Sequence, residues 1–197
     1  MGLTAVPHGQ CAAIVTHLEM VERPQLQPQA LSPGPLRLMH WPDPDLVKYR
    51  ALFARVGTPW LWFSRAVMPD NELAAILGNP AVEVFAVTDP HGSEVGMLEL
   101  DFSDLPNCEI AYFGLAPELN SSGHGRWLMA ETLARAWRKE VRRVWVHTCT
   151  LDHPSALGFY RAQGFVPFKR EIETFPDPRL SGHLPRDAAP QVPLLET

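Results

Sequence analysis

A glycine-rich loop, Asn120-Ser121-Ser122-Gly123-His124-Gly125, has the residue types and spacing of an anion site. An apolar run precedes it and an amphipathic segment follows, so it joins a predicted strand to a predicted helix. The first N–H groups of a helix lack an intrahelical acceptor, and with the helix dipole they attract anions. Glycines at 123 and 125 let a phosphate approach the main chain. Arg126 lies in the first turn, where its positive charge is unfavourable to the helix dipole. A bound anion would offset this repulsion.

Other readings of this loop follow from the same residues. A P-loop requires Gly-Lys-Ser/Thr, which the loop lacks, and a dinucleotide fingerprint requires glycine where Leu128 stands. The remaining alternative is that Gly123 and Gly125 only shape a turn between strand and helix, with Arg126 in solvent.

In its setting, the segment Leu115–Gly125 resembles the CoA-binding motif of the GNAT superfamily of N-acetyltransferases, usually written Arg/Gln-x-x-Gly-x-Gly/Ala. The resemblance extends over about Val82 to Glu173. Asn120 occupies the usual Arg or Gln position, so the main chain is the expected pyrophosphate ligand. The resemblance implies acetyl-CoA as co-substrate. The residues expected to bind it are Leu115, Ala116, Asn120, Ser121, Ser122, Gly123, His124, Gly125, Arg126, His153, Ala156 and Tyr160.

A second segment, Asp152–Phe165, resembles another GNAT signature, commonly Asn-x-x-Ala-x-x-x-Tyr-x-x-x-Gly-Phe. Four positions match, and His153 replaces the usual asparagine that contacts the pantetheine arm. Two motifs in the right order and spacing carry more weight than either alone. The matching residues are Ala156, Tyr160, Gly164 and Phe165.

Two side chains are candidates for proton transfer. The resemblance implies that Tyr160 protonates the departing CoA thiolate, which a phenol with a pKa of about 10 can do. Glu109 resembles a strand glutamate that accepts the amine proton in some family members, and Glu99 and Asp101 are weaker candidates for this base. The alternatives are a core aromatic for Tyr160 and an exposed strand carboxylate for Glu109.

Two further groups of residues have ambiguous roles. His147, Cys149 and His153 are close in sequence, but no Cys-x-x-Cys or second ligand pair accompanies them, so we predict no metal. The aromatic stretch Trp60-Leu61-Trp62-Phe63 could line an acceptor pocket or belong to the core.

The elements that position these residues follow from hydrophobic periodicity and turn signals. The order from residue 82 onward is β-β-β-α-β-α-β, beginning with an antiparallel hairpin and crossing through a helix into a parallel strand. The predicted fold class is therefore α/β (α+β type). The resemblance implies a mixed, mostly antiparallel central sheet, flanked by helices and splayed at the CoA site. Expected helices are 45–56, 70–77, 123–140 and 154–163; expected strands are 12–18, 36–39, 82–87, 95–102, 108–115, 143–150 and 165–174.

Prolines concentrate near both ends of the chain and divide it into three parts. We expect an N-terminal strand and proline-rich arm at 1–34, a GNAT acetyltransferase domain at 35–175, and a proline-rich tail at 176–197. The tail packs either on its own domain or on a second subunit, so a homodimer is possible.

Bulk composition bounds the partners and the compartment. The chain has 197 residues, 46% hydrophobic and 20% charged, with a formal net charge of −5. That charge disfavours nucleic acid and anionic membranes as partners. An odd count of three cysteines (Cys11, Cys108 and Cys149) does not form a disulfide framework, so we expect a cytoplasmic protein.

Together these features predict acetyl transfer from acetyl-CoA to a primary amine, with a small molecule as the expected acceptor. One alternative is acetylation of a protein N-terminus or lysine. Another is a CoA-binding module without catalytic activity.

Overall fold

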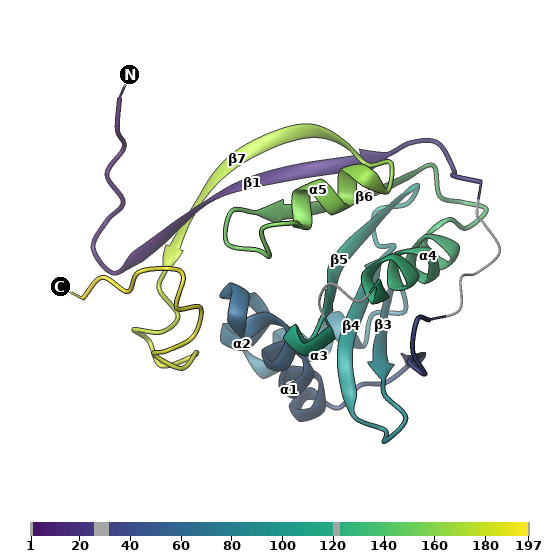
Figure 1. Cartoon of the computed structure of the whole chain (residues 1–197), viewed down its shortest axis with the longest axis horizontal. Helices are drawn as coiled ribbons and strands as arrows, with labels where there is room; N and C mark the ends of the chain where they lie inside the picture. The colour runs from purple at the N-terminus through teal and green to yellow at the C-terminus, as the bar shows by residue number, and fades with distance from the viewer. Residues whose placement is uncertain (1, 26–31, 120–122, 197) are drawn as a thin grey trace.

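The computed structural model describes residues 2–25, 32–119 and 123–196. Within them, seven strands form one sheet in the order β2-β3-β4-β5-β6-β1-β7 (Figure 1). All neighbouring strands are antiparallel except β5 and β6. The strands are β1 Gln10–Met20, β2 Arg37–Trp41, β3 Val82–Thr88, β4 Glu94–Asp101, β5 Asn107–Leu115, β6 Arg143–Cys149 and β7 Val166–Pro176.

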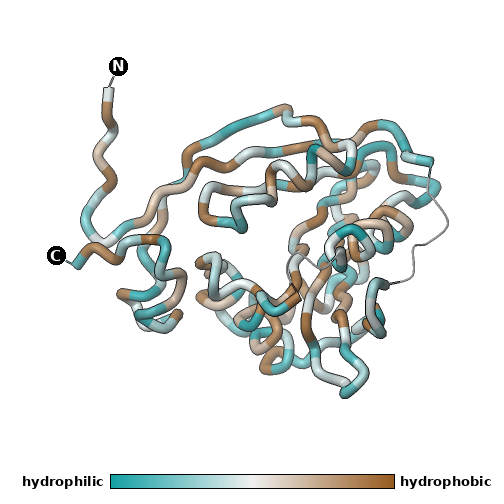
Figure 2. Tube along the Cα trace, in the orientation of Figure 1, coloured by the Kyte–Doolittle hydropathy of each residue, from teal (hydrophilic) through white to brown (hydrophobic). Residues whose placement is uncertain are grey.

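Helices cover both faces of this sheet. Helices α1 and α3 pack on the face that carries Val84 and Met97, whereas α4 and α5 pack on the face that carries Phe85 and Leu98. Successive side chains of β3 and β4 point to opposite faces of the sheet, so neighbouring residues belong to two separate hydrophobic cores. Figure 2 shows apolar segments gathered where α1 meets the sheet. The helices are α1 Leu46–Gly57, α2 Ser64–Val67, α3 Asp70–Leu77, α4 His124–Ala136 and α5 Ala156–Ala162, with 3-10 turns η1 Thr58–Trp60 and η2 Pro117–Leu119.

The sheet opens between its two central strands. β5 and β6 pair from Asn107 and Arg143 only as far as Ile110 and Val146. At that point β5 also carries a bulge, because the β4 partners shift so that Ala111 stands between two paired residues. The predicted α/β class, with a mostly antiparallel sheet that splays at this place, is confirmed.

β1 lies inside the sheet. It pairs with β6 on one side and with β7 on the other, both antiparallel. The sequence indicated a strand here but not its neighbours. Its position makes β6 and β7 parallel to each other across an intervening strand from the other end of the chain.

Helix α4 differs from its predicted extent and orientation. It ends at Ala136 rather than at residue 140, and Trp137 and Val141 are buried from the turn that follows. The sequence placed Glu131 on the outer face, which is wrong: Glu131 is buried. Its carboxylate pairs with Arg135 at 2.5 Å as predicted, but Arg135 also lies over the Phe85 ring and closes this side of the helix. None of the described helices is long and apolar enough to cross a membrane.

The chain after β7 folds back onto its own domain around a buried ion pair. Arg179 Nη2 lies 2.7 Å from Asp177 Oδ2, and both side chains are almost fully buried. Arg179 also donates to the carbonyl oxygens of Ala188 and Val192. Cys11 of β1 donates its thiol to Asp177, so the pair links both ends of the chain.

We predict that Arg179→Ala lowers the free energy of unfolding by about 3 kcal/mol, because it leaves the Asp177 carboxylate buried without its cation. Urea denaturation of the purified protein measures this change. Arg186→Ala is the matched control, since the Arg186–Glu196 pair is exposed and its loss changes the free energy by less than about 1 kcal/mol. Equal effects of the two substitutions would contradict a structural role for the buried pair.

Candidate active site

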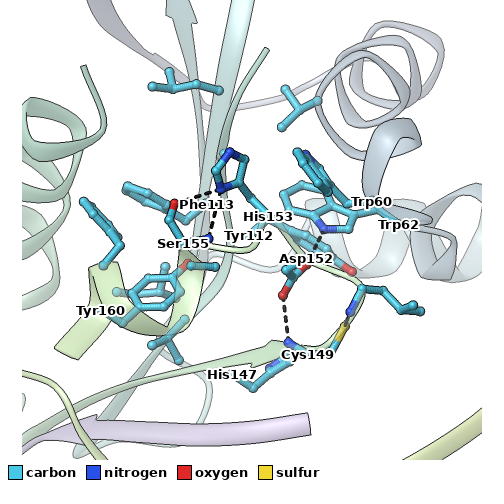
Figure 3. A pocket seen from close by; sticks show the side chains of 18 of the residues that line it. Trp60, Trp62, Tyr112, Phe113, His147, Cys149, Asp152, His153, Ser155 and Tyr160 are labelled. Carbon is cyan, nitrogen blue, oxygen red and sulfur yellow. Dashed lines mark hydrogen bonds between the residues drawn. The ribbon is translucent and has the colours of Figure 1, made fainter. Parts of the chain in front are cut away.

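A cavity of about 630 Å³ occupies the opening between β5 and β6. The start of α4 borders one end, and the segment after α1 borders the other. In Figure 3, Tyr160 lies on one side of the cavity, and Trp60 and Trp62 lie across from it. A volume of this size suits a small molecule or the reactive end of a larger one.

The start of α4 has the features of an anion site. Gly123 caps the helix with a φ of +84°, a left-handed conformation that favours glycine. Gly123, Gly125 and the exposed Arg126 all line the cavity. Arg126 forms no ion pair with any residue that the structure describes, so its charge is available to an anion.

The other residues predicted to bind CoA divide into three groups. Leu115, His153, Ala156 and Tyr160 join the glycines and Arg126 in lining the cavity. Ala116 and His124 do not line it. The Ala116 N–H donates to Val95 within the sheet, and the His124 ring is buried within 3.4 Å of the Ser32 hydroxyl. Asn120, Ser121 and Ser122 lie outside the described residues.

Tyr160 lines the cavity from α5 (Figure 3). The aromatic rings of Phe113, Phe159 and Phe165 surround it, and only 6% of its surface is exposed. Burial, with a smaller contribution from the Asp152 charge, raises the pKa of Tyr160 well above that of free tyrosine. The phenol therefore keeps its proton at neutral pH.

Glu109 does not itself line the cavity but contacts a residue that does. Its Oε1 lies 3.5 Å from Nδ1 of His147, whose half-exposed ring borders the cavity. Hydrogen bonding to Glu109 is the main cause of the raised pKa of His147, and burial opposes it. An imidazole in this position can accept a proton.

His147 is a cavity residue to which sequence reasoning gave no part in proton transfer. Its alignment with Glu109 depends on the register of β5 and β6, which no local pattern reveals. Cys149 also lines the cavity, and burial raises the pKa of its thiol to about 11, so it is a poor nucleophile at neutral pH. No group of three potential metal-binding side chains gathers among the residues described here.

The two weaker base candidates lie elsewhere. Glu99 is fully buried and accepts hydrogen bonds from Tyr49 and Arg65, each at 2.6 Å, so it fastens α1 and α2 to β4. The Asp101 carboxylate accepts the N–H of Ser103 in a turn.

Asp152 connects the two sides of the opening. It accepts a hydrogen bond from the Trp62 indole at 3.1 Å, and also from the Thr148 hydroxyl and the Cys149 main chain (Figure 3). The aromatic stretch at 60–63 lines the cavity, and its members also pack against buried clusters, Trp62 on one and Leu61 and Phe63 on another. Trp62 fits there because Gly114 leaves space on β5.

Comparisons with known proteins identify the family and the fold of the chain. The family model described as "Acetyltransferase (GNAT) family" matches residues 49–165. No curated protein matches the chain.

Solved structures with the same fold share little sequence with the chain. An aminoglycoside acetyltransferase from an uncultured soil metagenomic sample is 21% identical, with a TM-score of 0.54 over 66% of this chain and 88% of its own. A GCN5-related N-acetyltransferase from Sphaerobacter thermophilus is 17% identical, with a TM-score of 0.60 over 86% of this chain and 52% of its own. A tandem GNAT protein from the clavulanic acid biosynthesis pathway is 18% identical, with a TM-score of 0.60 over 85% and 55%. The chain thus spans about half the length of the last two.

We predict that Gly114→Ala lowers the free energy of unfolding by about 2 kcal/mol through overpacking. A Cβ at this position would lie 2.5 Å from Val56 Cγ1 and 3.0 Å from the Trp62 ring. Gly158→Ala is the matched control: it lies within α5 with nothing near its Cβ position, so we expect an increase of about 0.5 kcal/mol from helix propensity. Thermal and urea denaturation measure both, and a neutral Gly114→Ala would contradict the close packing.

Proposed function

Because the chain belongs to the acetyltransferase (GNAT) family, we propose that it transfers the acetyl group of acetyl-CoA to a primary amine of a small molecule. The observation that carries the proposal is the continuity of the cavity. One cavity joins the start of α4, the phenol of Tyr160 and the imidazole of His147. An anion site, a proton donor and a proton acceptor thus border the same space.

The donor side of the cavity is suited to CoA. Main-chain N–H groups at the start of α4 and the Arg126 guanidinium would hold the pyrophosphate. Beyond Ile110, the edge of β5 that faces β6 pairs with no strand in the described part of the chain, so its main chain can hydrogen-bond the pantetheine amides. An N–H of this same edge can polarise the acetyl carbonyl.

The proton transfers follow from the two titratable side chains. His147, held by Glu109, takes a proton from the acceptor nitrogen as that nitrogen bonds to the carbonyl carbon. When the carbon–sulfur bond breaks, Tyr160 donates its proton to the sulfur, which leaves as a thiol. A neutral amine loses one proton and the sulfur gains one, and exchange with solvent then returns His147 and Tyr160 to their starting states, so the reaction balances without a covalent enzyme intermediate.

Two measurements test this function: calorimetric titration with acetyl-CoA, and thiol release with a panel of amines. We expect binding of acetyl-CoA and turnover with at least one amine. Tyr160→Phe removes the proton donor, so kcat falls about 100-fold. Its affinity for acetyl-CoA stays unchanged, which separates loss of chemistry from loss of the site.

Absence of acetyl-CoA binding by the wild-type protein would overturn the proposal. Binding without turnover on any amine or peptide would indicate a non-catalytic CoA-binding module. Turnover on peptides alone would indicate a protein acetyltransferase.

We predict an acidic limb in the pH profile of kcat/KM, because only neutral His147 accepts a proton. Glu109 raises the pKa of His147, so activity is lost as pH falls through a value above that of free histidine. Glu109→Gln lowers this pKa and moves the limb to lower pH. Glu19→Gln is the control, because Glu19 pairs with Arg143 on the neighbouring strands. A limb at the same pH in wild type and Glu109→Gln would refute the role of His147.

A further inference from the structure

The end of the cavity away from α4 forms an acceptor lobe with an apolar, aromatic wall. It is reached past Tyr160 and His147, where the proposed reaction takes place (Figure 3). The side chains that define the acceptor lobe are Trp60, Leu61, Trp62, Phe63, Leu151 and Phe175. They come from the segment after α1, the loop after β6, and the end of β7.

This wall is fixed in place by the C-terminal tail. Leu61 adopts a φ of +54°, unusual for a residue other than glycine, and is 2% exposed within a cluster that includes Phe175 and Leu184. The Phe63 and Phe175 rings stack with centroids 4.3 Å apart. Gln191 of the tail donates a hydrogen bond to the Pro59 carbonyl at 2.7 Å. Since neighbouring groups hold the rings, the lobe is preorganised for an apolar guest.

Charge in this part of the cavity is sparse. Among the described residues that line the cavity, the carboxylates are Asp152 and Glu173. Three protein donors already engage Asp152. Glu173 lines the same cavity, and its side chain forms no hydrogen bond or ion pair with a described residue. One carboxylate without a described partner, in the cavity that His147 also lines, suits one ammonium group.

We propose that the acceptor is a primary monoamine with an aromatic body, of the arylalkylamine class. This inference rests on the proposed function and narrows it. The ammonium pairs with Glu173 in the cavity and gives up one proton to solvent before its nitrogen attacks, and the aromatic body enters the acceptor lobe. A polycation such as a polyamine or an aminoglycoside would place further ammonium groups against the apolar wall, where desolvation opposes binding.

Rates of thiol release with 2-phenylethylamine, ethanolamine, spermidine, kanamycin and a lysine tripeptide test this inference. We expect kcat/KM for 2-phenylethylamine to exceed that for ethanolamine by roughly 10- to 100-fold, the effect of burying one aromatic ring. We also expect kcat/KM for 2-phenylethylamine to exceed kcat/KM for spermidine, for kanamycin and for the lysine tripeptide.

Two variants locate the preference. Phe63→Ala lowers kcat/KM for 2-phenylethylamine but not for ethanolamine, whereas Phe168→Ala, which removes a ring of β7 outside the cavity, changes neither. Glu173→Gln raises KM for 2-phenylethylamine without weakening acetyl-CoA binding. Glu171→Gln is its control on the same strand, because Glu171 pairs with His17 and Lys169 and lies outside the cavity.

The outcomes distinguish failure of this inference from failure of the proposed function on which it rests. Preference for spermidine, kanamycin or the peptide would overturn the arylalkylamine inference and leave acetyl transfer standing. Equal loss of activity on all amines in Phe63→Ala, together with no effect of Glu173→Gln, would also overturn it. Lack of acetyl-CoA binding would remove the proposed function, and the inference with it.

Discussion

Hydrogen bonding between β5 and β6 ends at Ile110 and Val146, and beyond these residues the two strands separate. The site depends on this separation of the strands. Main-chain N–H and C=O groups inside a protein require partners, so two central strands rarely diverge without other groups between them. Here the bulge at Ala111 turns β5 away from β6, and a cavity fills the opening. The opening leaves Tyr160 of α5 and His147 of β6 on the borders of one space.

The two ends of the cavity are built in different ways. The end at α4 is local: one strand, one turn and one helix follow each other along the chain, with Gly123 in a conformation that suits its type. The other end is assembled from distant segments. Trp62 bonds to Asp152 across the opening, and Leu61 is buried against the C-terminal tail. A local motif can bind the same donor in many proteins, whereas long-range packing can differ from one chain to the next.

The two proposed proton-transfer groups lie in different environments, and each environment shifts the pKa of its group. Apolar rings surround Tyr160, and its burial favours the protonated phenol. His147 lies beside Glu109, which favours the protonated imidazole after proton uptake. Burial therefore keeps Tyr160 protonated before it donates, whereas Glu109 stabilises the imidazolium that forms when His147 accepts a proton.

Local patterns in the sequence determined most of the elements. Apolar runs bounded by turn residues predicted β3, β4 and β5; apolar spacing predicted α1; and glycines at a strand-to-helix junction predicted the start of α4. The resemblance placed Tyr160, Gly125 and Ala156 in one site, and all three line the cavity. Such features depend on residues close along the chain, which is why they could be read from it.

Only the tertiary structure decided what depends on register and long-range packing. The β5–β6 register sets His147 beside Glu109, and the folded tail holds the wall that contains Leu61. The early end of α4 and the burial of Glu131 likewise follow from packing against the sheet rather than from helical spacing. The sequence by itself determined the proposed donor site at the start of α4, because the residues of that motif are neighbours along the chain. The acceptor lobe depends on contacts between residues far apart in the chain, so only the folded molecule defines it.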